Sequence, residues 1–234
     1  MVSGNRFTNN RTLDDDGGAL YAGSNIVVSS NVFANNIADE VGGALTVRED
    51  ARITKNTFIN NRSGGNGGAI HAEDLGFPES SITDNLFEGN SAAGEGGAMW
   101  IDDDEGVMDH KVVIASNRVI RNTAQYGAGI YVTFPESSTN PTQLMSGIIR
   151  NSFERNVASL NGGGIMMEYR GGTFSNARAA LAALKKAVKN NRYKANKANL
   201  DRATGDIGGW AITIEVRALE EVEAVKTPEA PSVR

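Results

Sequence analysis

The 234-residue sequence predicts an all-β fold: a right-handed, single-stranded parallel β-helix, which is a solenoid of about seven coils. Three periodic features predict this fold. A phrase of the form NxFxxN recurs, a glycine-rich phrase follows each copy, and a β-branched apolar residue stands three positions before each copy. A chain that returns to the same chemistry on every turn stacks like residues on like residues.

The first phrase occurs six times, once with valine in place of phenylalanine. The copies are Asn5/Phe7/Asn10, Asn31/Phe33/Asn36, Asn56/Phe58/Asn61, Asn85/Phe87/Asn90, Asn117/Val119/Asn122 and Asn151/Phe153/Asn156. Alternation of period two around each copy indicates short strands. We expect the phenylalanines inside the solenoid and the asparagines in turns, where each side-chain amide can bond the coils above and below.

The second phrase and the preceding apolar residue keep the same register. The second phrase is Gly17-Gly18-Ala19-Leu20, Gly42-Gly43-Ala44-Leu45, Gly67-Gly68-Ala69-Ile70, Gly96-Gly97-Ala98-Met99, Gly127-Ala128-Gly129-Ile130 and Gly162-Gly163-Gly164-Ile165. The apolar residues are Val2, Val28, Ile53, Ile82, Ile114 and Ile148. Glycine adopts backbone angles that a residue with a Cβ resists, which favours a tight turn before each Leu/Ile strand.

The C-terminal part predicts one more coil, an inserted helix and a tail. Val188, Asn191, Tyr193, Asn196 and Gly208-Gly209 repeat the two phrases, which places a seventh coil near 188–217 with its last strand at 210–217. Residues 176–189 have apolar side chains at helical spacing after a capping asparagine, so a short helix is expected there. We expect one β-helix over 1–217 and a frayed or linking tail over 218–234.

Charge and composition exclude several classes of protein. The net charge is −5, with −9 over residues 1–175 (12 Lys/Arg against 21 Asp/Glu) and +4 over 176–234 (11 against 7), so nucleic acid is not the expected partner of the acidic body. No cysteine is present, which excludes disulfides and thiolate metal sites. No apolar run approaches the roughly 20 residues of a transmembrane helix, and no signal peptide is seen. We expect a monomer or part of a longer chain.

The outward side of the Gly-Gly-Ala strand carries the candidate binding residues. If Leu20 and its equivalents point inward, the residues pointing outward are Tyr21, Thr46, His71, Trp100, Tyr131 and Met166, and two positions later Gly23, Arg48, Glu73, Asp102, Thr133 and Glu168. Aromatic rings beside charged groups suit sugar faces and hydroxyls. The pattern predicts a carbohydrate groove lined by Tyr21, Arg48, His71, Glu73, Trp100, Asp102 and Tyr131; the alternative is a ladder that packs on itself.

Longer connections are expected beside these outward residues. The spacing between leading asparagines is 26, 25, 29, 32, 34 and 40 residues, and the extra residues fall after the Gly-Gly-Ala strand, at 73–81, 102–111, 133–146 and 169–187. Loops on one side of a rigid scaffold are common binding sites.

Carboxylates among these outward residues leave a catalytic alternative open. Glu73 and Asp102 on neighbouring rungs would lie about 5 Å apart, and Asp102 and Glu168 two rungs apart about 9.6 Å, which are the spacings of retaining and inverting glycosidases. No cofactor is expected, although Asp14–Asp16 and Asp102–Glu105 are oxygen-rich segments of the kind that bind calcium.

The Gly-Gly-Ala-Ile and FxxN phrases over residues 2–170 resemble the repeats of chlamydial polymorphic outer-membrane proteins and related autotransporter passengers. The resemblance implies a right-handed β-helix at the cell surface or outside the cell. The first functional hypothesis is therefore a non-catalytic surface solenoid for adhesion or for binding a polysaccharide, a host glycan or a protein. The alternatives are a β-helical polysaccharide lyase or glycoside hydrolase, with Asp102, Glu73 and Glu168 as its carboxylates, and an architectural spacer.

Overall fold

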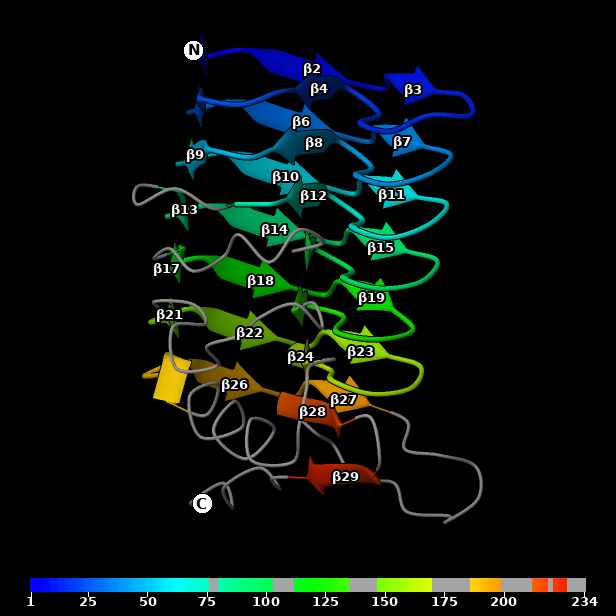
Figure 1. Cartoon of the computed structure of the whole chain (residues 1–234). Coiled ribbons are helices and arrows are strands. Elements are labelled where there is room, and N and C mark those ends of the chain that lie inside the picture. Colours follow the sequence, from blue (N-terminus) through cyan, green and yellow to red (C-terminus); the bar gives the residue numbers. More distant parts are fainter. Residues whose placement is uncertain are drawn as a thin grey trace.

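The computed structural model describes seven stretches of the chain, which form a stack of short and mainly parallel strands, one coil upon the next (Figure 1). The described residues are 1–75, 80–102, 112–134, 147–169, 186–198, 212–218 and 221–226. The stack runs from the N-terminus at one end to the C-terminal strands at the other (Figure 1). The expected fold class, an all-β right-handed parallel β-helix, is confirmed.

Each coil contributes strands to four sheets, here called A to D. Sheet A contains β1 (Val2–Ser3), β5 (Ile26–Ser29), β9 (Ala51–Thr54), β13 (Ser81–Thr83), β17 (Val113–Ala115), β21 (Gly147–Ile149) and β25 (Val188–Lys189). Sheet B contains β2 (Arg6–Thr8), β6 (Val32–Ala34), β10 (Thr57–Ile59), β14 (Leu86–Glu88), β18 (Arg118–Ile120), β22 (Ser152–Glu154) and β26 (Arg192–Lys194).

The other two sheets complete each coil. Sheet C contains β3 (Arg11–Thr12), β7 (Ile37–Ala38), β11 (Arg62–Ser63), β15 (Ser91–Ala92), β19 (Thr123–Ala124), β23 (Val157–Ala158) and β27 (Lys197–Ala198). Sheet D contains β4 (Leu20–Ala22), β8 (Leu45–Arg48), β12 (Ile70–Glu73), β16 (Met99–Asp102), β20 (Ile130–Phe134), β24 (Ile165–Tyr169), β28 (Ile212–Ala218) and β29 (Glu221–Lys226).

The interior consists of columns of equivalent side chains, as the repeat predicts. In sheet B, Phe33 pairs in register with Phe58 and Phe58 with Phe87. All three side chains are fully buried, and their rings stack with centroids 4.8 and 4.9 Å apart. The β-branched column of sheet A and the Leu/Ile column of sheet D fill the remaining interior. Sheet C supplies the small residues Ala38, Ser63, Ala92, Ala124, Ala158 and Ala198.

Two kinds of corner bend each coil. Only two residues separate sheet A from sheet B, and two separate B from C; the first of each pair has a positive φ and the second is a ladder asparagine, as in Asn60-Asn61. Between sheets C and D, the glycine phrase makes the corner, and Gly42 and Gly67 have φ near +65°. A Cβ on the following Gly43 would lie 2.2 Å from the carbonyl oxygen of Gly68, so coils touch backbone to backbone here.

The asparagine ladders bond each coil to its neighbours on both sides, as expected. The Asn61 side-chain oxygen accepts from the backbone N and the side-chain Nδ2 of Asn36, at 3.0 and 2.9 Å. Its own Nδ2 donates to the Phe33 carbonyl and to the Asn90 oxygen. These side chains are buried, and their hydrogen bonds satisfy polar groups that would otherwise be costly to bury.

The C-terminal part differs in detail from the expectation. Strand β28 pairs in parallel with β24, close to the strand expected at 210–217. Residues 221–226, which we expected in a linking tail, form β29 and pair antiparallel with β28. Most of the expected helix 176–189 and the Gly208-Gly209 phrase lie outside the described residues; Lys186 and Ala187 are helical, and Val188–Lys189 belong to strand β25 of the seventh coil.

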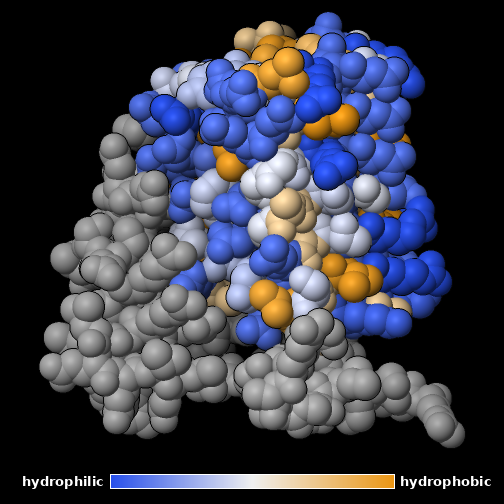
Figure 2. All heavy atoms as spheres, turned by 90° about the vertical axis from the view of Figure 1, so that its right-hand side faces the viewer, coloured by the Kyte–Doolittle hydropathy of each residue, from blue (hydrophilic) through white to orange (hydrophobic). Residues whose placement is uncertain are grey.

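The side of the molecule formed by sheet C carries mainly hydrophilic side chains, with hydrophobic ones in small separate groups (Figure 2). Among the described residues, the large hydrophobic side chains that are exposed are Met1, Leu13, Tyr21 and Val157. Most of the apolar surface is therefore used inside the columns, where it stabilises the stack.

Candidate functional site

The candidate site is the outer face of sheet D, where the expected outward residues lie side by side. Strand pairing places Tyr21 beside Thr46, Thr46 beside His71, His71 beside Trp100, Trp100 beside Tyr131 and Tyr131 beside Met166. A second row, also in register, joins Arg48, Glu73 and Asp102, and further along Thr133 and Glu168. The sequence placed the first row in its observed register, and in the second row the pairings of Arg48 with Glu73, Glu73 with Asp102 and Thr133 with Glu168 are as expected.

The first coils form an exposed aromatic and charged group. Tyr21 is 48% exposed, and the Arg48 guanidinium lies 5.7 Å from the centre of its ring. Arg48 Nε also forms an ion pair with Glu73 Oε2 at 2.6 Å. A ring that is half open to solvent and held by a cation can offer one face to a flat ligand.

His71 and Trp100 form a stacked pair in the middle of the face. Their ring centroids lie 4.3 Å apart at an interplanar angle of 16°. His71 is only 5% exposed, and its burial, together with a smaller effect of the positive charge on Arg48, lowers its pKa to about 3. Both ring nitrogens of His71 and the Trp100 Nε1 are buried, and within the described part of the chain none has a hydrogen-bond partner.

The carboxylates farther along the face are buried and engaged. Asp102 is 7% exposed and accepts a hydrogen bond from the Thr133 hydroxyl. Glu168 is 1% exposed and accepts one from the Tyr131 hydroxyl. The row of carboxylates is thus built into the protein, since each contributes to a contact between neighbouring coils.

The face is more closed than an open groove. Thr46, His71, Tyr131 and Met166 are buried, Trp100 is partly buried, and Tyr21 is exposed. Contacts between neighbouring residues of the row therefore bury part of this face, as expected if the row packs on itself. The long connections expected at 73–81, 102–111, 133–146 and 169–187 lie mostly outside the described residues.

One contributor was missed by the sequence analysis. Tyr126 lies in the connection between sheets C and D, and its ring meets that of Tyr131 edge-on, with centroids 6.5 Å apart. Connections between sheets C and D have no fixed residue pattern. The one feature of the sequence that could have indicated Tyr126 is its position directly before Gly127.

No metal centre is evident in the described part of the chain. Among those residues, no three His, Cys, Asp or Glu side chains gather as metal ligands would. In the first acidic segment, Asp16 accepts a hydrogen bond from the Val41 backbone at 3.2 Å. In the second, Asp103–Glu105 lie outside the described residues.

The fold and the register of its columns define a parallel β-solenoid of repeated coils. Residues 1–139 match the family model described as the right handed beta helix region, which covers more than half of the chain. The chain therefore belongs to this family. No curated protein and no solved structure gives a significant match. No helix among the described residues has the length and apolarity needed to cross a membrane.

Proposed function

We propose that this protein is a non-catalytic β-solenoid, displayed at a cell surface or outside the cell, that binds a glycan on the outer face of sheet D. The observation that carries the proposal is the set of three buried ring nitrogens on His71 and Trp100 that have no hydrogen-bond partner among the described residues. Leaving buried polar atoms unpaired costs free energy, so a native protein usually has a use for them.

These atoms are buried, so a ligand reaches them only if the atoms that cover them move aside; a hydroxyl-rich ligand would then satisfy them. A neutral histidine offers one donor and one acceptor, and an indole offers one donor, which together match sugar hydroxyls that both donate and accept. The low pKa of His71 keeps its ring neutral at ordinary pH. The neighbouring Tyr21 ring and the Arg48–Glu73 ion pair extend the same surface toward the first coil. Stacking on an aromatic ring and hydrogen bonding to charged groups are the usual means of holding a sugar.

The same contacts disfavour the hydrolase and lyase alternative. Asp102 and Glu168 are buried and accept hydrogen bonds from Thr133 and Tyr131, and Glu73 is paired with Arg48. A general acid or nucleophile must reach the glycosidic bond, and these side chains face neighbouring coils instead. The likeness of the repeats to those of polymorphic outer-membrane proteins supports an adhesive role at a surface.

The test is a glycan array followed by titration calorimetry on the full chain and its Trp100→Phe variant. Phenylalanine keeps the stack on His71 but removes the indole N–H. We expect the best glycan to bind about fivefold to tenfold more weakly to the variant, the effect of about one hydrogen bond. The melting temperature should not fall, because the deleted group has no protein partner among the described residues.

The matched control is Thr123→Ala, an exposed position on sheet C that should leave binding unchanged. Absence of binding to every glycan on the array would refute the proposal and favour a purely architectural spacer. Release of reducing ends or unsaturated products from polysaccharides, abolished by Asp102→Asn, would refute it in favour of the enzyme.

A further inference from the structure

Charge is divided along the axis of the solenoid. Over the described residues 1–75 and 80–102 there are 6 Lys/Arg against 13 Asp/Glu, a net charge of −7. Over 112–134, 147–169 and 186–198 there are 9 against 2, a net charge of +7. The overall charge of −5 therefore hides a strongly basic region in coils 5 to 7.

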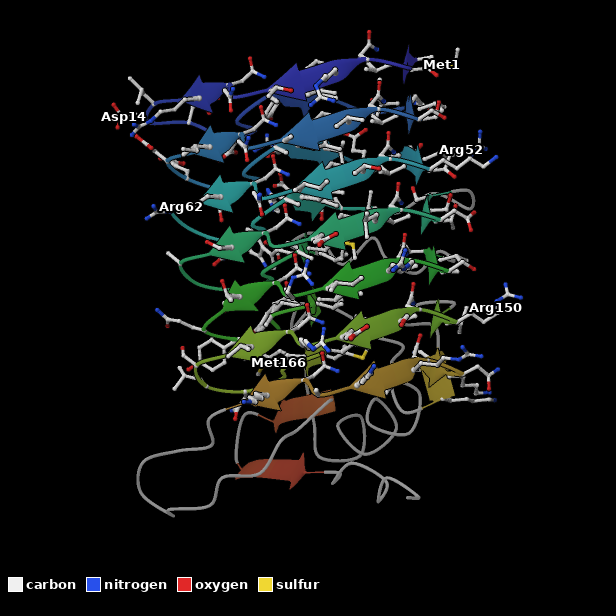
Figure 3. All side chains as sticks on the ribbon, turned by 180° about the vertical axis from the view of Figure 1, so that it is seen from behind. Met1, Asp14, Arg52, Arg62, Arg150 and Met166 are labelled. Atoms are coloured by element: carbon white, nitrogen blue, oxygen red, sulfur yellow. The ribbon has the colours of Figure 1, made fainter. Side chains whose placement is uncertain are left out.

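The nine Lys and Arg residues counted in these coils lie on sheets A to C, on the corners between them or just before sheet A, and none of the nine is on sheet D. Strand pairing in sheet B aligns Arg118, Ser152 and Arg192 on its outer surface. Exposed Lys and Arg side chains lie on sheet B of these coils and on the neighbouring corners and strands, and together they are called the basic face. They are Arg118, Arg121, Arg150, Arg155, Lys189, Arg192, Lys194 and Lys197. Arg150 extends outward from the edge of the stack at this level (Figure 3).

Most of this charge is not neutralised within the protein. Arg121 pairs with Glu88, and Glu154 pairs with Arg155 at 3.2 Å and with Lys194 at 3.6 Å. In the described part of the chain, five members of the face take part in no ion pair: Arg118, Arg150, Lys189, Arg192 and Lys197. Exposed cations without an ion-pair partner among the described residues attract anions from solution.

The shape of the face favours an extended polymer. Two-residue corners flank sheet B on both sides, so among the described residues no long connection enters or leaves this sheet. The rungs repeat at about 4.8 Å, which places Arg118 and Arg192, two rungs apart, about 9.6 Å from each other along the axis. A ligand with anionic groups at regular intervals can meet several cations at once, whereas one small anion can meet only one or two.

We propose that the basic face of coils 5 to 7 binds a linear anionic polysaccharide that carries carboxylate or sulfate groups. Among the described outward positions of this face, no aromatic side chain offers a platform on which nucleobases could stack. The acidic coils 1 to 4 would repel a polyanion, so binding should be confined to the basic coils. This site lies on a different sheet from the proposed glycan face and does not depend on it.

The test measures binding of heparin and alginate to the full chain, with dextran as the neutral polymer. We expect anionic polymers to bind in about 50 mM salt and to dissociate as salt rises, because bound counterions are released on binding. The triple variant Arg118→Gln, Arg150→Gln, Arg192→Gln should bind at least about tenfold more weakly. The matched control Arg6→Gln, Lys55→Gln, Arg62→Gln removes the same charge from coils 1 to 3 and should change the affinity less than about twofold.

Several outcomes would overturn this proposal. Equal losses in the two triple variants would show that only net charge matters. Binding of a single-stranded oligonucleotide or of phosphatidylserine vesicles, without binding of heparin or alginate, would assign the face to another partner. Trp100→Phe should leave heparin binding unchanged, and a parallel loss would mean that the two sites are one. Circular dichroism and melting curves for each variant establish that the coils remain folded.

Discussion

Each asparagine inside a ladder joins three coils through one side chain, whereas, among the described residues, those in the first coil bond only one neighbouring coil, the one that follows. The Asn61 amide contacts Asn36 and Phe33 on one side and Asn90 on the other, with donor–acceptor distances of 2.9 to 3.1 Å. Because the amide both donates and accepts, every member of the ladder can repeat the same contacts on the next rung. The ladder therefore favours one register: a coil shifted by one residue would lose these bonds.

Replacing Asn61 by alanine should destabilise the protein by about 3 kcal/mol, because it removes several buried hydrogen bonds and leaves their partners unpaired. Urea unfolding measures this change. Asn10→Ala is the matched control: Asn10 is exposed, and among the described residues its side chain donates only to Asn36, so the substitution should cost less than about 1 kcal/mol. Equal costs at the two positions would contradict the buried ladder.

His71 should make the fold sensitive to acid. Its pKa is about 3 in the folded protein and near 6.5 when unfolded, so between these values the unfolded chain binds more protons. Stability is therefore full above pH 6.5 and is lost as the pH falls toward 3. His71→Phe keeps the stack on Trp100 and removes the titration. Relative to this variant, the native protein should lose about 2 to 3 kcal/mol between pH 6.5 and 4.5. If the free energies of unfolding of the two proteins changed equally with pH, this would contradict the burial of a neutral His71 ring.

The columns of equivalent residues could be predicted from the sequence, but how far each side chain is exposed to solvent could not. Phe33, Phe58 and Phe87 were recognised from spacing alone, because identical contacts on every coil leave identical residues in the sequence. The outward register of His71 and Trp100 followed from the same alternation. Burial of His71 could not be predicted, because it depends on tertiary contacts that no local pattern encodes.

Among the structural elements, the corners between sheets determine how each coil turns. Gly43 lies where the coil passes from sheet C to sheet D, and a Cβ there would be 2.2 Å from the Gly68 carbonyl oxygen and 2.5 Å from the Arg62 carbonyl carbon. Both obstacles are backbone atoms of the next coil, which cannot move without separating the coils. The glycine is required by this close approach rather than by its φ.

Gly43→Ala should therefore destabilise the fold by about 4 kcal/mol or prevent folding, as overpacking against a rigid neighbour does. Gly23→Ala is the matched control, because a Cβ at Gly23 meets nothing within 4 Å. Its effect should stay within about 0.5 kcal/mol. Melting temperatures of the two variants make the comparison, and a stable Gly43→Ala protein would contradict the backbone contact between coils.

The corners between sheets A, B and C were harder to predict than the glycine corner. Lys55 and Arg121 both have φ near +57°, although neither residue type favours this conformation. In the sequence, these corners are indicated by the ladder asparagine that follows each of the two residues. Strand β29 was also missed, since its antiparallel pairing with β28 has no counterpart in the repeat.

Across the whole molecule, three groups of residues occupy three separate regions. The interior columns stabilise the stack. Within the described part of the chain, the outer face of sheet D holds the ring nitrogens that have no hydrogen-bond partner, and the basic face of coils 5 to 7 holds the cations that form no ion pair. The separation is possible because side chains alternate between the two sides of a strand, although outward residues such as Asp102 also bond to a neighbouring coil.

The most direct test of the stacked register uses pairs of spin labels on the outer column of sheet C. Strand pairing aligns Arg11, Ile37, Arg62, Ser91, Thr123, Val157 and Lys197, and the chain contains no native cysteine. Cysteines are introduced at Arg11 and, in turn, at Thr123, Val157 or Lys197, which lie four, five and six rungs away.

Pulsed electron paramagnetic resonance should give label separations near 19, 24 and 29 Å, rising by about 4.8 Å with each rung. The increments are the decisive quantity, because the length of the label itself cancels between pairs. Separations that do not rise by one rung spacing from one pair to the next would contradict the winding of this chain into a stack of equivalent coils.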